Sequence, residues 1–403
     1  MSSGFNLEKI YQYLLIILAF LIPITVAGAN VIIVIICLLW LFSGNYKAKY
    51  IQIIESKLMI ASIIFFGLHV LGLIWTENII WGLEITHKMW YFLLLFPVLH
   101  SIVNKDYIRY YIFAFLIAIT VTEVISYLVW FQIISDFKNA VPSNPTPFMS
   151  HISYNVILAF SIYLVCHELI FNKTLNQLIF FWYGSLSIAM IINMFITQGR
   201  AGQVMFFVVL VFLIFQFFDK KRFKAMFFIA IFIPGVFLTA YISSSIFHKR
   251  VDDTILNFTQ MDQYSSLDQY SGSSVGHRLV FTKNSWELIT NNPILGVGTG
   301  DFPDEYRKIN LVKSPDFPNV SNPHNMYTLV FSQLGLFGLL SMLSIMYYQI
   351  KLSLLETNKF YRDVGFVLPI LFLVIMWSDS YLLGHYTTLM YVFFSSFLYK
   401  RFD

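Results

Sequence analysis

The sequence predicts an all-α polytopic integral membrane protein with about twelve transmembrane helices and one large polar loop. Of its 403 residues, 58% are hydrophobic and 12% are charged, whereas a soluble domain carries about 25% charged residues. The mean hydropathy is +0.69. Apolar stretches of roughly the 20 residues that cross a bilayer recur along the chain. Most of the chain is therefore expected to lie among membrane lipids, and the net charge of +4 is too small to indicate a nucleic-acid partner.

The apolar stretches define the candidate spans in order. The first two are short and are joined at Pro23 to Asn30, so they can also form one broken element. The last two are separated only by a tight junction at Ser378-Asp379. The twelve candidate spans are 11–27, 30–43, 57–74, 89–103, 109–134, 153–171, 177–197, 201–218, 222–242, 325–350, 361–377 and 380–399.

The distribution of Lys and Arg predicts the orientation of these spans, because positive residues concentrate in short cytoplasmic loops. With a cytoplasmic N-terminus, the short external segments hold only Lys88, Lys138 and Arg200. We therefore expect both termini in the cytoplasm and the large loop in the periplasm or at the cell exterior; the family resemblance described below implies that the membrane is a bacterial inner membrane. The cytoplasmic segments then hold Lys9, Lys47, Lys49, Lys57, Lys105, Arg109, Lys173, Lys220, Lys221, Arg222, Lys224, Lys351, Lys359, Arg362, Lys400 and Arg401.

The large loop, 243–324, separates nine predicted spans in 1–242 from three in 325–403. Residues 248–276 show no apolar period and are predicted to form a flexible cover. Residues 277–290 place apolar side chains at mixed spacings of three and four, which is typical of an amphipathic helix resting on the membrane domain.

A glycine-rich run follows this predicted helix, after the stop signal Asn291-Asn292-Pro293. The run reads Gly296-Val-Gly298-Thr-Gly300 and is followed by Pro303. A phosphate-binding nucleotide loop needs a strand before it and a helix after it. A tight re-entrant turn near the active site is therefore the preferred interpretation.

Two arginines are candidates for binding an anion. Arg200 lies in the short external turn Thr197–Gly202. It either extends to the lipid interface or faces a polar cavity, and the glycines on both sides favour the cavity because they leave room for a ligand. Arg278 is either an interfacial cation or, at the start of the 277–290 helix, a second ligand group. Two guanidinium groups from distant segments would suit a diphosphate.

His324 is the candidate for proton transfer. It ends the polar loop within Asn322-Pro323-His324-Asn325 and opens an apolar stretch. A single histidine is more often structural, but this one is expected at the membrane edge on the same side as both arginines. A histidine can exchange a proton near neutral pH.

The residues around His324 also resemble a known family. His324-Asn325, nine further residues and Gly335-Leu336-Phe337-Gly338 match the pattern H-[NSQ]-x9-G-x-x-[GTY], which resembles that of the O-antigen ligase superfamily. The glycine-rich run and the Gly199–Gly202 turn resemble the same family, and the likeness covers about 185–345. One departure is that this turn reads Gln198-Gly199-Arg200, where members of the family often have Ser before the arginine.

The resemblance implies a membrane glycosyltransferase whose donor is a glycan on undecaprenyl diphosphate. It implies that Arg200 and Arg278 stabilise the diphosphate leaving group and that His324 is the general base, with inversion at the anomeric carbon. It implies no cofactor and no metal, and membrane lipids as surroundings. Further candidates for contact with substrate are Asn325, Asp301, His277 and Asp379.

Three functions remain open at this stage. A ligase would transfer the glycan to a lipid A-core acceptor, and a polymerase would transfer it to a growing glycan. The motif does not separate these two because they share their chemistry. A flippase or small-molecule transporter is disfavoured, since transporters built from inverted repeats show matched halves and this chain has one dominant loop late in the sequence.

Overall fold

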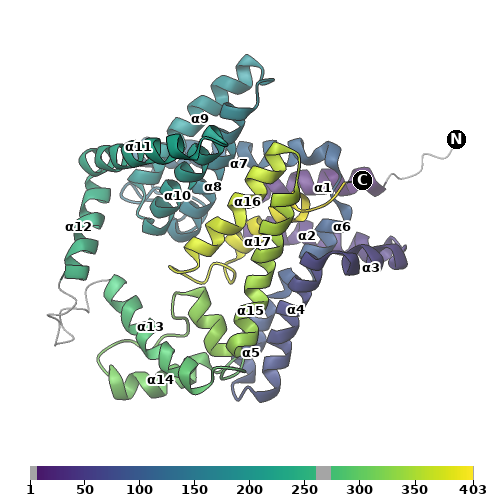
Figure 1. The fold of residues 1–403 in the computed structure, drawn as a ribbon, viewed down its shortest axis with the longest axis vertical. Coiled ribbons are helices and arrows are strands. Elements are labelled where there is room, and N and C mark those ends of the chain that lie inside the picture. Colours follow the sequence, from purple (N-terminus) through teal and green to yellow (C-terminus); the bar gives the residue numbers. More distant parts are fainter. Residues whose placement is uncertain (1–6, 260–273, 403) are drawn as a thin grey trace.

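The computed structural model describes residues 7–259 and 274–402, and helices make up most of this part (Figure 1). This part contains no β-strand and only two isolated β-bridges, Phe137 to Ala140 and Val141 to Asn144. The all-helical prediction is therefore confirmed. The α-helices are α1 Leu7–Leu21, α2 Val26–Phe42, α3 Tyr46–Glu55, α4 Lys57–Leu71, α5 Ile79–Lys88, α6 Phe96–Ile102, α7 Ile108–Trp130, α8 His151–Phe171, α9 Gln177–Ile196, α10 Arg200–Phe218, α11 Arg222–Ser243, α12 Ser245–Thr259, α13 Ser274–Asn291, α14 Phe302–Lys313, α15 Met326–Leu355, α16 Lys359–Ile375 and α17 His385–Leu398.

Each predicted apolar stretch contains a helix, but fewer helices are long enough to span a membrane. The described residues contain seven helices of sufficient length and apolarity, or up to eight if α2 and α3, bent by 114°, form one span. The helices α1, α16 and α17 have 15, 17 and 14 residues and are shorter than these seven candidates. Twelve spans therefore stay a prediction. The seven are Lys57–Trp75, Lys105–Trp130, His151–Phe171, Gln177–Ile196, Arg200–Phe218, Arg222–Ser243 and Met326–Leu355.

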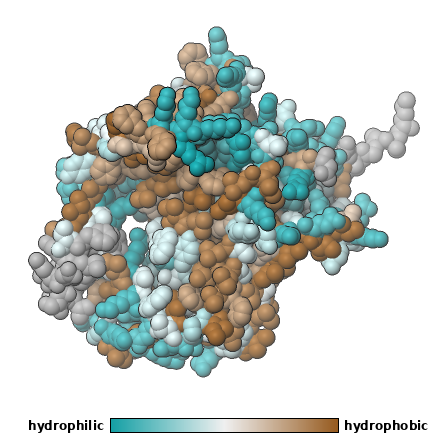
Figure 2. All heavy atoms as spheres, viewed as in Figure 1, coloured by the Kyte–Doolittle hydropathy of each residue, from teal (hydrophilic) through white to brown (hydrophobic). Residues whose placement is uncertain are grey.

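Burial differs sharply between the spans. Along α8, every residue from Tyr154 to Val165 is buried, because α8 packs against both α9 and α10. On α11, by contrast, large apolar side chains such as Phe223, Phe227 and Ile242 are exposed. Figure 2 shows the extensive hydrophobic surface that such side chains produce. Such an apolar surface is energetically favourable in contact with lipid chains and unfavourable in contact with water.

The predicted 277–290 helix is confirmed as α13, which forms a separate lobe with α14 at one end of the molecule (Figure 1). The lobe has its own small core, which the membrane helix α15 completes. The prediction that 248–276 is a flexible cover is wrong for its first part, because α12 extends to Thr259. The Ser244 hydroxyl caps the N-terminus of this helix, because it accepts a hydrogen bond from the Phe247 N–H at 3.2 Å. Residues 260–273 lie outside the described part. The lobe core consists of Phe281, Leu288, Phe302, Tyr306 and Leu329.

The glycine-rich run joins this lobe to α15 through backbone contacts. Inside α15, Gly335 has φ +60°, which interrupts the helix and frees backbone groups for the loop. The N–H of Leu336 donates to the Pro293 carbonyl at 2.9 Å, and the N–H of Gly298 donates to the Gln333 carbonyl at 3.0 Å. A β-carbon on Gly335 would lie 2.1 Å from the Ile294 carbonyl oxygen. The first glycine of the pattern, Gly335, therefore permits this close backbone approach.

We expect Gly335→Ala to destabilise the protein strongly. The substitution combines a left-handed backbone conformation, which costs about 1–3 kcal/mol for a non-glycine residue, with a steric clash against the loop. The melting temperature of the purified protein in detergent should fall by several degrees. Gly67→Ala in α4 is the matched control, since nothing lies within 4 Å of its β-carbon position. That variant should be neutral or more stable by up to about 1 kcal/mol, and an equal loss in both variants would refute this account.

Candidate active site

His324 is held in a tight turn immediately before α15. Its φ of +53° lies in the left-handed region that non-glycine residues seldom occupy. The Asn322 side chain maintains the turn, because its Oδ1 accepts from the His324 N–H at 2.9 Å and from the Ser380 hydroxyl at 2.8 Å. Asn325 then caps α15 by accepting from the Thr328 N–H at 3.1 Å. The local sequence thus fixes the histidine against the loop between α16 and α17.

The partner of His324 in this loop is Asp379. The Nδ1 atom of His324 lies 3.2 Å from Oδ1 of Asp379. The same carboxylate oxygen accepts from the Ser380 N–H at 2.7 Å. The Asp379 side chain is 15% exposed, whereas that of His324 is 41% exposed. The carboxylate therefore sits behind the imidazole, and the imidazole faces outward.

Electrostatics keeps the Asp379 carboxyl ionised. Burial alone raises its pKa, but the hydrogen bond and charge of His324, the Ser380 N–H and the charge of Arg278 outweigh burial. The pKa of Asp379 therefore lies below its ordinary value. An ionised carboxylate at Nδ1 favours the tautomer with a proton on Nδ1, which leaves Nε2 as the acceptor. This arrangement suits a general base that is oriented by a carboxylate.

We expect Asp379→Asn to lower stability by about 1 kcal/mol at neutral pH, the typical contribution of one hydrogen bond. Because the folded pKa of Asp379 is lowered, its contribution is present above the unfolded pKa of about 3.9 and is lost as the pH falls through the lower, folded value. Melting temperatures of the wild type and the variant should therefore differ at pH 6 and converge toward pH 3. A difference that grows on acidification would contradict the assignment.

Arg200 begins α10 in a turn that is packed against α8. The Asn155 side chain donates to the Gly199 carbonyl at 3.2 Å and accepts from the Thr197 hydroxyl at 3.0 Å. A β-carbon on Gly202 would lie 2.2 Å from that of Asn155. The two glycines that flank the arginine are therefore needed for the close contact between α8 and α10, which places Arg200 at the end of the helix pair.

Three arginines from three helices share one region. The charges of Arg250 on α12 and Arg278 on α13 both act on the Arg200 guanidinium, and the carboxylate of Asp253 offsets them in part. The charge of Arg278 also acts on Asp379, the partner of His324. Like charges that are brought together in this way repel each other unless an anion binds between them. Figure 2 shows the surface hollowed between α12, α13 and α15, with hydrophilic side chains at its border.

The remaining predicted residues have contacts of other kinds. Asp301 is buried, and its carboxylate accepts from the backbone N–H groups of Glu77 and Asn78 at 3.0 and 2.8 Å. These bonds connect the start of α14 to the start of α5. His277 packs its ring between Phe281 and Phe317. The structure thus gives Asp301 and His277 contacts that hold the lobe together, and their contact with substrate stays a prediction.

Sequence reasoning missed Arg250 and Asn322. Arg250 donates from Nη2 to the Gln198 side chain at 3.3 Å, next to the Arg200 turn. It was overlooked because its segment was interpreted as a flexible cover. The capping serine Ser244, followed by a helix-compatible run, was the available signal. Asn322 directly precedes Pro323 in the motif, and an Asn before a turn commonly bonds to backbone N–H groups nearby.

Comparison with known proteins bears on these residues. Residues 185–343 match the family model described as O-antigen ligase. The matched segment contains Arg200, Arg278 and His324 together with Gly335. This segment of the chain is therefore similar to the O-antigen ligase family. No curated protein matches the chain. The family comprises O-antigen ligase or polymerase-like membrane glycosyltransferases, so an enzyme that acts on a lipid-linked glycan is indicated.

The described residues contain no group of three or more His, Cys, Asp or Glu side chains placed to hold a metal ion. The structure brings together His324 with Asp379 on one side and the three arginines on the other. Arg278 links both groups electrostatically. An anionic substrate and a proton acceptor can therefore meet at this place.

Proposed function

We propose that this protein, which resembles the O-antigen ligase family over residues 185–343, transfers a glycan from undecaprenyl diphosphate to a lipid A-core acceptor on the periplasmic side of the inner membrane. The observation that carries the proposal is the pairing of His324 with Asp379 beside three converging arginines. The proposal includes twelve spans, cytoplasmic termini, and a catalytic loop at 243–324. The position of the α13–α14 lobe and the Lys and Arg distribution support this topology.

The reaction breaks the bond between the anomeric carbon and a phosphate oxygen of the donor. Negative charge then develops on the diphosphate, and we assign its stabilisation to Arg200, Arg278 and Arg250. Guanidinium groups bind phosphate oxygens in a planar, bidentate way, and they act strongly where water is scarce. The mutual repulsion of the three cations in the free enzyme is relieved when the diphosphate binds.

The new bond forms between the acceptor hydroxyl oxygen and the anomeric carbon. In the proposed mechanism, Nε2 of His324 accepts the hydroxyl proton while Asp379 holds Nδ1–H and stabilises the imidazolium that results. Attack from the face opposite the diphosphate inverts the anomeric centre. Oδ1 of Asn325 caps α15 and so helps to place His324, and the contact of Asn325 with substrate stays a prediction.

The polymerase is the second candidate, because it uses the same donor and the same residues. A gene deletion separates the two functions by the lipopolysaccharide that remains. With a missing ligase, the gel should show bare core, and the polymerised glycan should stay on its lipid carrier. With a missing polymerase, the core should carry a single repeat unit. An unchanged profile after deletion would refute both proposals.

A further inference from the structure

A second polar cavity lies at the opposite end of the helices from His324. It has a volume of about 780 Å³, which is within the usual range of small-molecule sites. The start of α16 lines it at Lys359, whereas the other end of α16 leads into the Asp379 loop. The 17 residues of α16 place the two sites about 25 Å apart. The starts of α7 and α9 and the end of α8 form the other walls.

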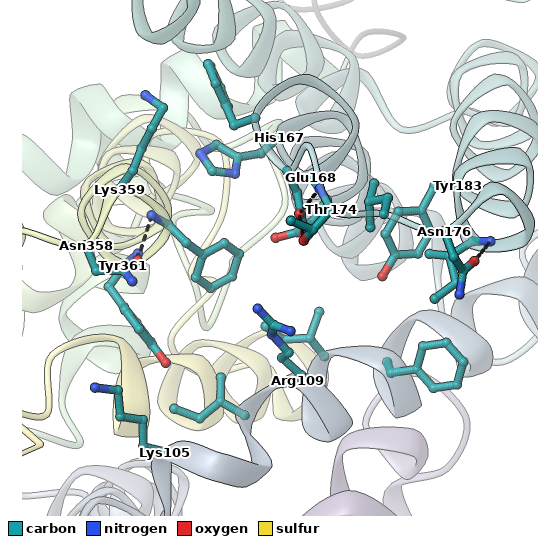
Figure 3. Close-up of a pocket in the computed structure, with 18 of the residues that line it drawn as sticks. Lys105, Arg109, His167, Glu168, Thr174, Asn176, Tyr183, Asn358, Lys359 and Tyr361 are labelled. Carbon is teal, nitrogen blue, oxygen red and sulfur yellow. Dashed lines mark hydrogen bonds between the residues drawn. The ribbon is translucent and has the colours of Figure 1, made fainter.

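Two opposite charges face this cavity without meeting each other. Figure 3 shows Arg109 of α7 and Glu168 of α8 pointing into the same space. Within the described residues, Arg109 has no ion pair or side-chain hydrogen bond. One oxygen of Glu168 accepts from the neutral Asn172 amide at 2.7 Å, and this carboxylate likewise has no cationic partner in that part of the chain. A ligand that carries both a cation and an anion would satisfy both groups.

Among the other charges that line the cavity, Lys359 is compensated, whereas Lys105 and Asp106 form no ion pair within the described residues. Lys359 pairs with the buried Asp363 at 2.8 Å and lies 4.0 Å from the centre of the Phe171 ring. His167 is 2% exposed, and its Nε2 lies 3.3 Å from the Asp363 carboxylate. Its Nδ1 has no hydrogen-bond partner among the described groups. The cavity thus contains a buried histidine, His167, whose Nδ1 is available for a hydrogen bond, next to Arg109 and Glu168.

The cavity also adjoins an apolar outer surface. Phe113 lines it and is 40% exposed. Leu178 and Phe181 flank the lining residue Ile179 on α9 and are 80% and 69% exposed. A ligand with acyl chains could lay them on this surface while its polar part enters the cavity.

We propose that this cavity binds the headgroup of an aminophospholipid, with the phosphate at Arg109 and the primary ammonium at Glu168. The shared chemistry is phosphoethanolamine, carried either by a membrane lipid or by a soluble ester, and the apolar surface favours the lipid. An ammonium with three N–H donors satisfies a carboxylate better than a choline group, which has none. A glycerol headgroup supplies no cation for Glu168. This site is independent of the glycan transfer proposed above.

Native mass spectrometry of the purified protein with an equal mixture of ethanolamine, choline and glycerol phospholipids of identical acyl chains tests the proposal. We expect at least tenfold more ethanolamine lipid than either other lipid to remain bound to the wild type. Arg109→Gln should lower retention of that lipid at least tenfold. Glu168→Gln should remove the preference for ethanolamine while phosphate-dependent binding persists.

Lys221→Gln is the matched control, because Lys221 is an exposed cation at the same end but outside the cavity. It should bind lipids as the wild type does. Lys105→Gln is a second cavity variant if Arg109→Gln gives little folded protein. Binding of the three lipids in proportion to their supply, or equal losses in Arg109→Gln and Lys221→Gln, overturns the proposal. Displacement by soluble O-phosphoethanolamine at concentrations equal to the lipid overturns the assignment to a lipid.

Discussion

His324→Ala is expected to lower the rate of glycan transfer by about 10²–10⁴, the usual contribution of a general base. The loss follows from the position of the imidazole, which Asp379 orients at Nδ1 and which remains 41% exposed toward the substrate side. Folding should be little affected, because this exposed side chain fills no core. Initial rates with purified protein, an undecaprenyl-diphosphate-linked glycan and the acceptor measure the effect directly.

His87→Ala provides the matched control. His87 is an exposed histidine on α5, outside the region of the three arginines. This variant should transfer glycan at the wild-type rate, with an unchanged melting temperature. If His324→Ala keeps more than about a tenth of the wild-type rate, the range expected for a general base is not reached and His324 is not the base.

Arg278→Ala and Arg200→Ala should each lower the transfer rate by about 10²–10³, the effect of removing one preorganised group that stabilises transition-state charge. The two residues reach the site from α13 and α10, and their charges act on each other. Arginine-to-lysine substitutions should restore only part of the rate, because a lysine cannot make the planar bidentate contact. The same transfer assay with saturating donor reports the change in turnover.

Arg307→Ala is the control for charge removal in the same lobe. Arg307 is exposed on α14, outside the three-arginine cluster. It should leave turnover unchanged. Arg250→Ala, by comparison, should lower the rate, because Arg250 acts on Arg200 and contacts Gln198 beside it. Equal rates for Arg307→Ala and Arg278→Ala would show that Arg278 contributes only to the general charge of the lobe.

The helices were largely predictable because their signals are local. Apolar runs of about 20 residues indicated every span-like stretch, and Asn291-Asn292-Pro293 correctly ended α13. The error at α12 shows the limit of this reasoning. Phe247, Val251 and Ile255 recur at intervals of four, so α12 has a helical period that the interpretation as a flexible cover overlooked. The Ser244 cap and contacts with α9, α11 and α13 add to it.

The site was predictable in its components and not in its pairing. His324, Arg200 and Arg278 stand out by residue type and by position at span ends. The pairing of His324 with Asp379 joins residues 55 positions apart, and no local pattern in the sequence connects them. Asp301 was a candidate for substrate contact as well, yet its carboxylate is bonded to the backbone at the start of α5.

The sequence by itself determined that the chain is helical and apolar, that one late polar segment interrupts it, and which histidine and arginines belong to a family motif. Only the tertiary structure decided which groups meet: Asp379 behind His324, and Arg250 with Arg200 and Arg278. The physical reason is that the hydrogen bonds of a helix join residues four apart, so the residues nearby in the sequence decide whether a helix forms. Contacts between distant segments depend instead on how whole helices pack, as at Gly202 against Asn155.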